Sequence, residues 1–298
     1  MEEEIKKELK ELYNSFDKTN NLYEKGYIVT LFGYLKRIFS DDDINQMYQN
    51  VYSKLNVYNV DYLQYFSVKE DKIEEFMQKK YDFFIQKIGK VRKVTELKGY
   101  LPTLSSESIE KIIDLFLQSI SMDIFSFYKK YKLENRILFS HDGNTAYTSL
   151  YNSNTIVFIP KMENLKDIMI LMHELGHAYY FYINNAKIRE RDDILVELKD
   201  EIPAKILEMK FIKFIKEKID YQQGLILDNI FDLNMYEYYI EEDDFDSLKY
   251  LIASFIAKKI SDKNFNISKY FERLYRNDIY NIVVENNNIK KLAKVLKR

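Results

Sequence analysis

Residues 168–181 read IMILMHELGHAYYF, which is an HExxH motif inside an otherwise apolar run. We predict a helix over about residues 165–183, with Asn164 and Asp167 forming a variant of the capping box at its N-terminus. Residues four apart on a helix lie about one turn apart on the same face. His173 and His177 can therefore reach a single metal ion.

The chemistry that this motif favours is metal-assisted hydrolysis. Zn²⁺ binds histidine nitrogens at about 2.0–2.1 Å and lowers the pKa of a bound water to about 7. Glu174 lies about 100° around the helix from His173, so its carboxylate flanks the metal without ligating it and can take a proton from that water. The chain has 3 histidines in all, which makes two of them around a glutamate a specific signal. We predict a catalytic Zn²⁺ site.

Composition narrows the class of protein. The 298 residues, 46% of them hydrophobic, fit one large or two modest domains. A formal net charge of −2 argues against a nucleic-acid partner. No cysteine is present, so any zinc must be held by histidines and carboxylates. We find no leader pattern and no apolar stretch of about 18 residues, and therefore expect a soluble, cytoplasmic protein without a membrane partner; its oligomeric state stays unknown.

Apolar spacing predicts a mainly α fold with a small β-sheet before the HExxH helix. Helical patterns cover about residues 1–18, 44–55 and 73–88, and another runs from Ser105 to about Lys132. Three short β-prone runs follow, at Ile137–Phe139, Ala146–Thr148 and Thr155–Ile159.

The break in the helical pattern at Gly99-Tyr100-Leu101-Pro102 is the best domain boundary. It predicts an N-terminal helical region over 1–100 and a catalytic domain over 101–298. Helical patterning resumes after residue 193 and continues through most of the remaining chain.

The third metal ligand should be a carboxylate, because catalytic zinc sites usually have three protein ligands and one histidine remains. Residue type alone leaves Glu190, Asp192, Asp193, Glu197, Asp200, Glu201 and Glu208 as candidates. Glu197, Glu201 and Glu208 share one face of a following helix that could pack antiparallel to the first. That face can supply one ligand and one carboxylate that orients a ligating histidine.

The chain resembles the oligopeptidase F and thimet oligopeptidase family of zinc metallopeptidases over about residues 110–260. The resemblance is carried by Ala146–Leu150, Asn152-Ser153, Thr155–Ile159, Leu165-Lys166-Asp167 before HELGHAYY, and Glu201-Ile202-Pro203-Ala204 followed by Glu208. By that resemblance Glu201 is the third ligand and Glu208 supports the site, with Glu197 as the fallback ligand.

The resemblance also implies an activity, the zinc-dependent hydrolysis of internal bonds in short peptides with Glu174 as the general base. In such peptidases a strand beside the cleft commonly pairs with the substrate backbone, and residues 143–149 are the candidate. Family members are commonly about twice as long, and their extra N-terminal helices wall a deep channel. We therefore expect a shallower channel here, or one completed by another subunit.

A further departure concerns the groups that stabilise the transition state. In the family, tyrosine and histidine side chains on a late helix donate to the tetrahedral intermediate. Residues 245–253 resemble that helix, but only Tyr250 remains as a donor. Tyr236, Tyr238 and Tyr239 are alternatives. His141 is interpreted as a loop histidine, and the basic tail over 290–298 as a terminal helix.

Two other functions stay open from the sequence. A repressor-cleaving protease of the ImmA/IrrE type also carries HExxH and a later glutamate ligand. A pseudoenzyme, acting as a helical binding module, would keep zinc or only the fold. Mn²⁺ or Co²⁺ could replace Zn²⁺ at such a site.

Overall fold

The computed structural model describes residues 2–18, 25, 28, 32, 42–57, 77, 82, 84–139, 146–151, 154–185, 194–240, 245–261 and 265–276. The chain forms two compact units, one of Met1–Glu75 with Ser140–Asp142 and one of Phe76–Phe139 with Gly143–Arg298. The candidate site lies wholly in the larger unit. The domain boundary at residue 100 stays a prediction.

The smaller unit contains α1 (Glu2–Phe16) and α3 (Asp42–Val57), which agree with two of the predicted helices. Their apolar faces are buried, at Leu12 and Phe16 on α1 and at Ile44 and Val51 on α3.

Of the helix predicted over 73–88, the described residues Met77, Asp82 and Phe84–Ile88 are helical, and the others lie outside the described residues.

The larger unit contains a three-stranded sheet in the order β1-β3-β2. β1 (Ile137–Phe139) pairs in parallel with β3 (Asn154–Ile159), and β2 (Tyr147–Tyr151) pairs with β3 antiparallel. Thr148 lies opposite Val157 in this register. Among the described strands, β2 therefore lies at the edge of the sheet, paired with β3 on one side.

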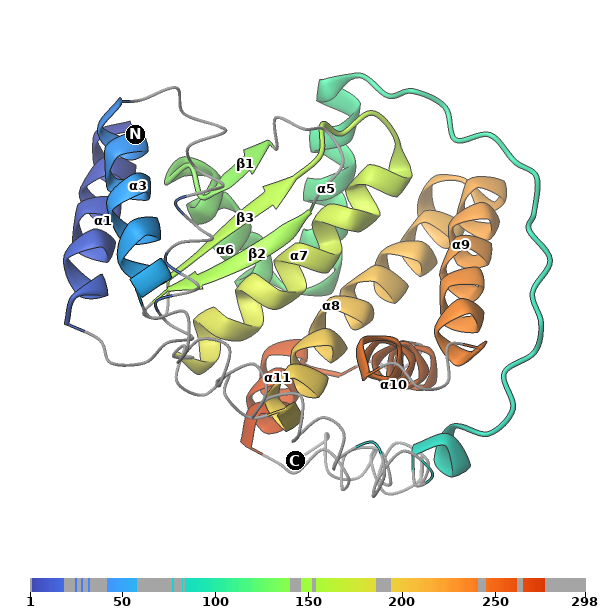
Figure 1. The fold of residues 1–298 in the computed structure, drawn as a ribbon. Helices are drawn as coiled ribbons and strands as arrows, with labels where there is room; N and C mark the ends of the chain where they lie inside the picture. The colour runs from blue at the N-terminus through green and yellow to red at the C-terminus, as the bar shows by residue number, and fades with distance from the viewer. Residues whose placement is uncertain are drawn as a thin grey trace. The chain divides into compact units, whose positions relative to one another are not determined.

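The HExxH motif lies on α7 (Leu165–Asn184), which runs beside the sheet (Figure 1). The predicted capping box is present: Asn164 accepts from the backbone N–H of Asp167, and the Asp167 carboxylate accepts from that of Asn164. Most of the helix from Leu165 to Phe181 is buried, as expected of a helix that is apolar all round. α7 is thus the centre of the core of this unit.

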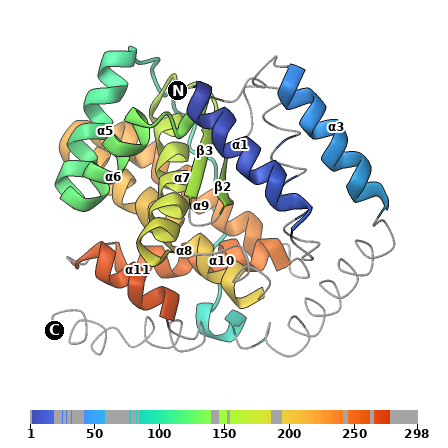
Figure 2. The same cartoon turned by 90° about the vertical axis from the view of Figure 1, so that its left-hand side faces the viewer.

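The prediction of a single helix from Ser105 to Lys132 is wrong, because the helical backbone is interrupted at Ser121. α5 (Ser106–Ile120) ends and α6 (Met122–Leu133) begins around this residue, whose backbone is extended (φ −169°, ψ 125°). The Ser121 hydroxyl accepts from the N–H of Ile124 and caps the second helix. Figure 2 shows the two helices beside α7.

Three of the helices that follow α7 in the sequence pack together, with the first of them, α8, at the centre. α8 (Ile194–Phe214) packs against both α7 and α10 (Phe245–Ile260), and α9 (Tyr221–Ile240) lies against α8 and α10 (Figure 1). A π-helical turn, η2, continues α8 over Ile215–Ile219.

α11 (Ile267–Arg276) packs on the C-terminal part of α7, where the hydroxyls of Tyr179 and Ser268 are 2.6 Å apart (Figure 2). The described elements therefore form a mainly α fold with a small sheet, as predicted. Among these helices, none combines the length and apolar character needed to span a membrane.

Candidate metal centre

The two histidines of HExxH lie side by side on α7, one turn apart. Their Nε2 atoms are 3.1 Å from each other. His177 is 9% exposed, and the side chain of His173 is 17% exposed. Both imidazoles are therefore largely buried, and part of the His173 side chain remains exposed to solvent.

α8 approaches α7 at Gly176, inside the motif. A Cβ atom built on Gly176 would lie 2.5 Å from the Cα of Ala204 and 2.8 Å from the carbonyl oxygen of Pro203. The two backbones are thus in direct contact, which only glycine permits here. This crossing carries Glu201, one turn before Ala204 on α8, to the histidines.

Glu201 completes a triangle of donor atoms with the two histidines. Its Oε2 lies 3.4 Å from His173 Nε2 and 3.6 Å from His177 Nε2. Donors about 2.0–2.2 Å from a tetrahedral metal are roughly 3.3–3.6 Å apart, and the three distances here, 3.1, 3.4 and 3.6 Å, are close to that range. Oε2 is also buried without a hydrogen-bond partner in the described part of the chain. An acceptor atom left in this way fits a ligand to a cation.

Burial and the charges of neighbouring groups shift the pKa values of Glu201 and His177 in opposite directions. Burial disfavours the ionised form of Glu201, but His177 and His173 outweigh it and lower its pKa to about 2. Burial likewise lowers the pKa of His177, but Glu201, with Glu174 and Asp200, raises it above the ordinary value. Glu201 and His177 therefore each favour the charged form of the other.

Glu208 and Lys205 support the centre from α8. A Glu208 carboxylate oxygen bonds His173 Nδ1, and the same oxygen accepts from Lys205 Nζ at 2.8 Å. Burial alone would raise the pKa of Glu208, but Lys205 and His173 lower it to about 2. The ionised carboxylate holds the imidazole with Nε2 facing the other ligands.

Lys205 is enclosed by three aromatic rings. Its Nζ lies 5.7 Å, 6.0 Å and 5.8 Å from the ring centroids of Phe231, Tyr238 and Tyr250. The lysine is 5% exposed. Such cation–π contacts and the bond to Glu208 together offset the cost of burying the ammonium group.

Glu174 is 5% exposed and lies next to the two histidines on α7. The Thr148 hydroxyl oxygen on β2 is 2.8 Å from Glu174 Oε2 and 2.9 Å from the Glu174 carbonyl oxygen. The candidate base is therefore held by a residue of β2, outside its own helix.

Tyr250 lies on α10 and stacks on Tyr238 of α9, with ring centroids 5.0 Å apart. Burial raises the pKa of Tyr250, and the negative charge of Glu201 raises it further. Burial also raises the pKa of Tyr238. The Tyr250 hydroxyl stays protonated at neutral pH, as a hydrogen-bond donor must.

Among the described candidates, only His173, His177 and Glu201 place donor atoms in this group. The group of donor atoms within 4.8 Å consists of His173, His177 and Glu201, in the described part of the chain. Asp200 is buried and acts on His177 through its charge. Several candidates from the sequence lie outside the described residues: His141, Glu190, Asp192, Asp193, residues 143–145, the basic tail and the side chain of Glu197.

Thr148 and Lys205 were missed at the sequence level. Lys205 follows Glu201 by four residues and precedes Glu208 by three, so its place on the same helix face could have been recognised. Thr148 gave no such signal, because its contact joins a strand to a helix residue 26 positions later.

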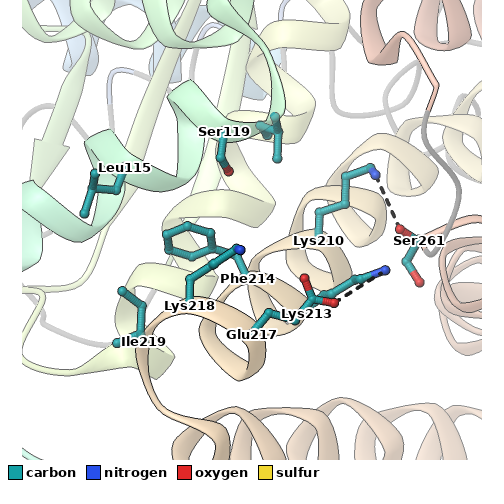
Figure 3. Close-up of a pocket in the computed structure, with 10 residues that line it drawn as sticks. Leu115, Ser119, Lys210, Lys213, Phe214, Glu217, Lys218, Ile219 and Ser261 are labelled. Carbon is teal, nitrogen blue, oxygen red and sulfur yellow. Dashed lines mark hydrogen bonds and ion pairs between the residues drawn. The ribbon is translucent and has the colours of Figure 1, made fainter.

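A cavity of about 600 Å³ lies at the far end of α8, lined by residues of α5, α8 and η2 and by Ser261 (Figure 3). Lys210 donates to the Ser261 carbonyl oxygen at 3.4 Å, and Lys213 pairs with Glu217 at 3.8 Å. α5 and α10 both end at this cavity. Lysines near helix C-termini are favoured by the helix dipole, so these contacts need no ligand.

Comparison with known proteins gives no family for this chain. No family model and no curated protein matches it. One solved structure with a detectable similarity is described as a "putative oligoendopeptidase F" from Bacillus anthracis strain Ames, with 15% sequence identity and a TM-score of 0.48. The match covers 93% of this chain and 64% of that chain. A similarity of this size assigns neither a family, a metal nor a substrate to this chain.

Proposed function

We propose that this protein is a zinc-dependent peptidase that hydrolyses internal bonds of short peptides. The observation that supports the proposal is the triangle formed by His173 Nε2, His177 Nε2 and Glu201 Oε2, with Glu174 beside it. Three protein donors on one side of a metal leave a coordination position for water, as in catalytic zinc sites.

Zn²⁺ held by these residues would polarise the scissile carbonyl and acidify a water. Glu174 then accepts the proton of the attacking water and delivers it to the leaving amine. Glu208 and Lys205 keep the His173 ring in its orientation. Tyr250 donates to the carbonyl oxygen as negative charge develops there.

The edge position of β2 supports an extended peptide as the substrate. A peptide can add to the side of β2 that β3 does not occupy, with its backbone paired to the strand. Thr148 joins this strand to Glu174. A peptide docked on β2 therefore lies next to the base.

The test measures metal content and peptide cleavage on the same preparation. We expect Zn²⁺ to bind in a one-to-one ratio and quenched peptides of graded length to be cleaved at internal bonds. Glu174→Gln should keep the metal and lose about 10²–10⁴ in kcat. Glu107→Gln, at the exposed start of α5, is the matched control and should cleave at the wild-type rate.

Three outcomes would contradict the proposal. Full activity in zinc-loaded Glu174→Gln would exclude Glu174 as the base. Bound zinc without cleavage of any peptide across a broad library would favour a binding module. Cleavage confined to one folded regulator would favour the repressor-cleaving class.

A further inference from the structure

Thr148 holds the candidate base through two contacts. Its hydroxyl oxygen lies 2.8 Å from Oε2 of Glu174 and 2.9 Å from the backbone oxygen of the same residue. The hydroxyl carries one proton, and both of these acceptors belong to Glu174. Oε2 is the favoured acceptor, because a charged carboxylate accepts a hydrogen bond more strongly than a neutral carbonyl oxygen.

The partners on both sides of this contact are rigid. Thr148 is β-branched and lies within the β2–β3 ladder opposite Val157, which restricts its side chain to few rotamers. Glu174 lies on α7 at the start of a run, Glu174–Phe181, in which every residue is buried. A hydrogen bond to a carboxylate is stronger than one between neutral groups. Fixing a glutamate side chain costs rotamer entropy, and the bond to Thr148 offsets part of that cost.

We propose that Thr148 is a positioning residue that holds the Glu174 carboxylate in its reactive orientation and aligns it with a peptide bound along β2. This inference rests on the proposed function. The same strand would then hold the substrate backbone and the base, so the distance between them is set by one rigid element.

Thr148→Val removes the hydroxyl and keeps the shape. We expect it to lower kcat about 10–100-fold, since a small misplacement of a reacting group costs up to about 10² in rate. KM and zinc content should change less than about threefold, because the hydroxyl contacts no metal ligand among the described residues. Thr148→Ser should restore most of kcat, since it returns the hydroxyl.

The matched control is Thr155→Val on the neighbouring strand β3. The Thr155 hydroxyl is buried and bonds Tyr131 at 2.7 Å, away from the metal ligands. Its loss should lower the melting temperature and leave kcat unchanged. If Thr148→Val behaves like Thr155→Val, the contact is structural and the inference is wrong.

A second measurement does not need turnover. Acetohydroxamic acid binds zinc and places a proton on the carboxylate beside the metal, so its affinity reports where that carboxylate lies. Titration calorimetry on zinc-loaded protein should show about tenfold weaker binding for Thr148→Val and recovery for Thr148→Ser. In a Glu174→Gln background, Thr148→Val should have no further effect.

The two proposals fail in different ways. An equal loss of hydroxamate affinity in both backgrounds, or no loss in either, would overturn the role of Thr148 even if peptides are cleaved. Coupling between Thr148 and Glu174 without cleavage of any peptide would instead overturn the peptidase and keep the positioning role.

Discussion

Gly176 of α7 and Ala204 of α8 touch through their backbones. A Cβ atom on Gly176 would stand 2.5 Å from the Ala204 Cα and 2.7 Å from its nitrogen. Glu201 lies one turn from this contact on α8, and the histidines flank it on α7. The separation of the two helices therefore sets the distances from Glu201 Oε2 to the two histidines.

Gly176→Ala should push the helices apart and open the metal site. Backbone atoms cannot yield as a side chain can, so we expect zinc affinity to fall by about 100-fold or more and stability by about 1–3 kcal/mol. Competition with a chelator and thermal unfolding measure the two effects. Gly99→Ala is the control, since its Cβ would meet only the Ile226 side chain. Wild-type zinc affinity in Gly176→Ala would show that the crossing does not set the site.

Lys205→Met should destabilise the metal-free protein by about 3–5 kcal/mol, because it leaves the Glu208 carboxylate buried without its ammonium partner. Lys205→Met with Glu208→Gln should recover most of that stability, since no charge is left uncompensated. Denaturant titration compares the three proteins. Equal stability of the single and double variants would contradict this account.

The gain in stability from zinc should increase with pH. The pKa values of Glu201 and Glu208 are depressed to about 2. Their contribution to the stability of the metal-free protein is therefore present above about pH 4.5 and is lost as the pH falls toward 2. The pKa of His177 is raised, so its contribution is present below about 6.5 and is lost as pH rises through the raised value.

The metal-free protein should therefore be most stable between about pH 4.5 and 6.5. If zinc binds at His177 in place of a proton, the zinc-loaded protein should keep its stability above that range. Melting temperatures measured with zinc and with chelator from pH 5 to 8.5 provide the test. A constant difference between the two series would show that proton and metal do not compete at His177.

Tyr250→Phe should lower kcat by about 10²–10³ with little change in KM, if its hydroxyl stabilises the developing oxyanion. Steady-state kinetics with a quenched peptide give both constants. Tyr238→Phe is the matched control, because it keeps the ring that stacks on Tyr250 and removes a neighbouring hydroxyl. Equal effects of the two substitutions would identify Tyr250 as a packing residue.

Local patterns explain what was predictable about the fold. The buried helix around HExxH, its capping box and the three strands follow from spacing within a few residues, and each was found. The break at Ser121 was missed because apolar spacing continues across it. A serine that caps a helix interrupts the backbone without interrupting the pattern.

For the site, the sequence alone determined what depends on one helix: two imidazoles one turn apart, a carboxylate beside them and the class of reaction that these groups favour. Residue type and spacing left seven carboxylates as the third donor, and resemblance selected Glu201. Only the tertiary structure decided which donor atoms meet, because that depends on the contact between Gly176 and Ala204. It also revealed the bonds of Thr148 and Lys205 to the site. Lys205 bonds Glu208 within α8, whereas Thr148 reaches Glu174 from a different element. Contacts between elements arise from packing, which no periodicity along the chain records.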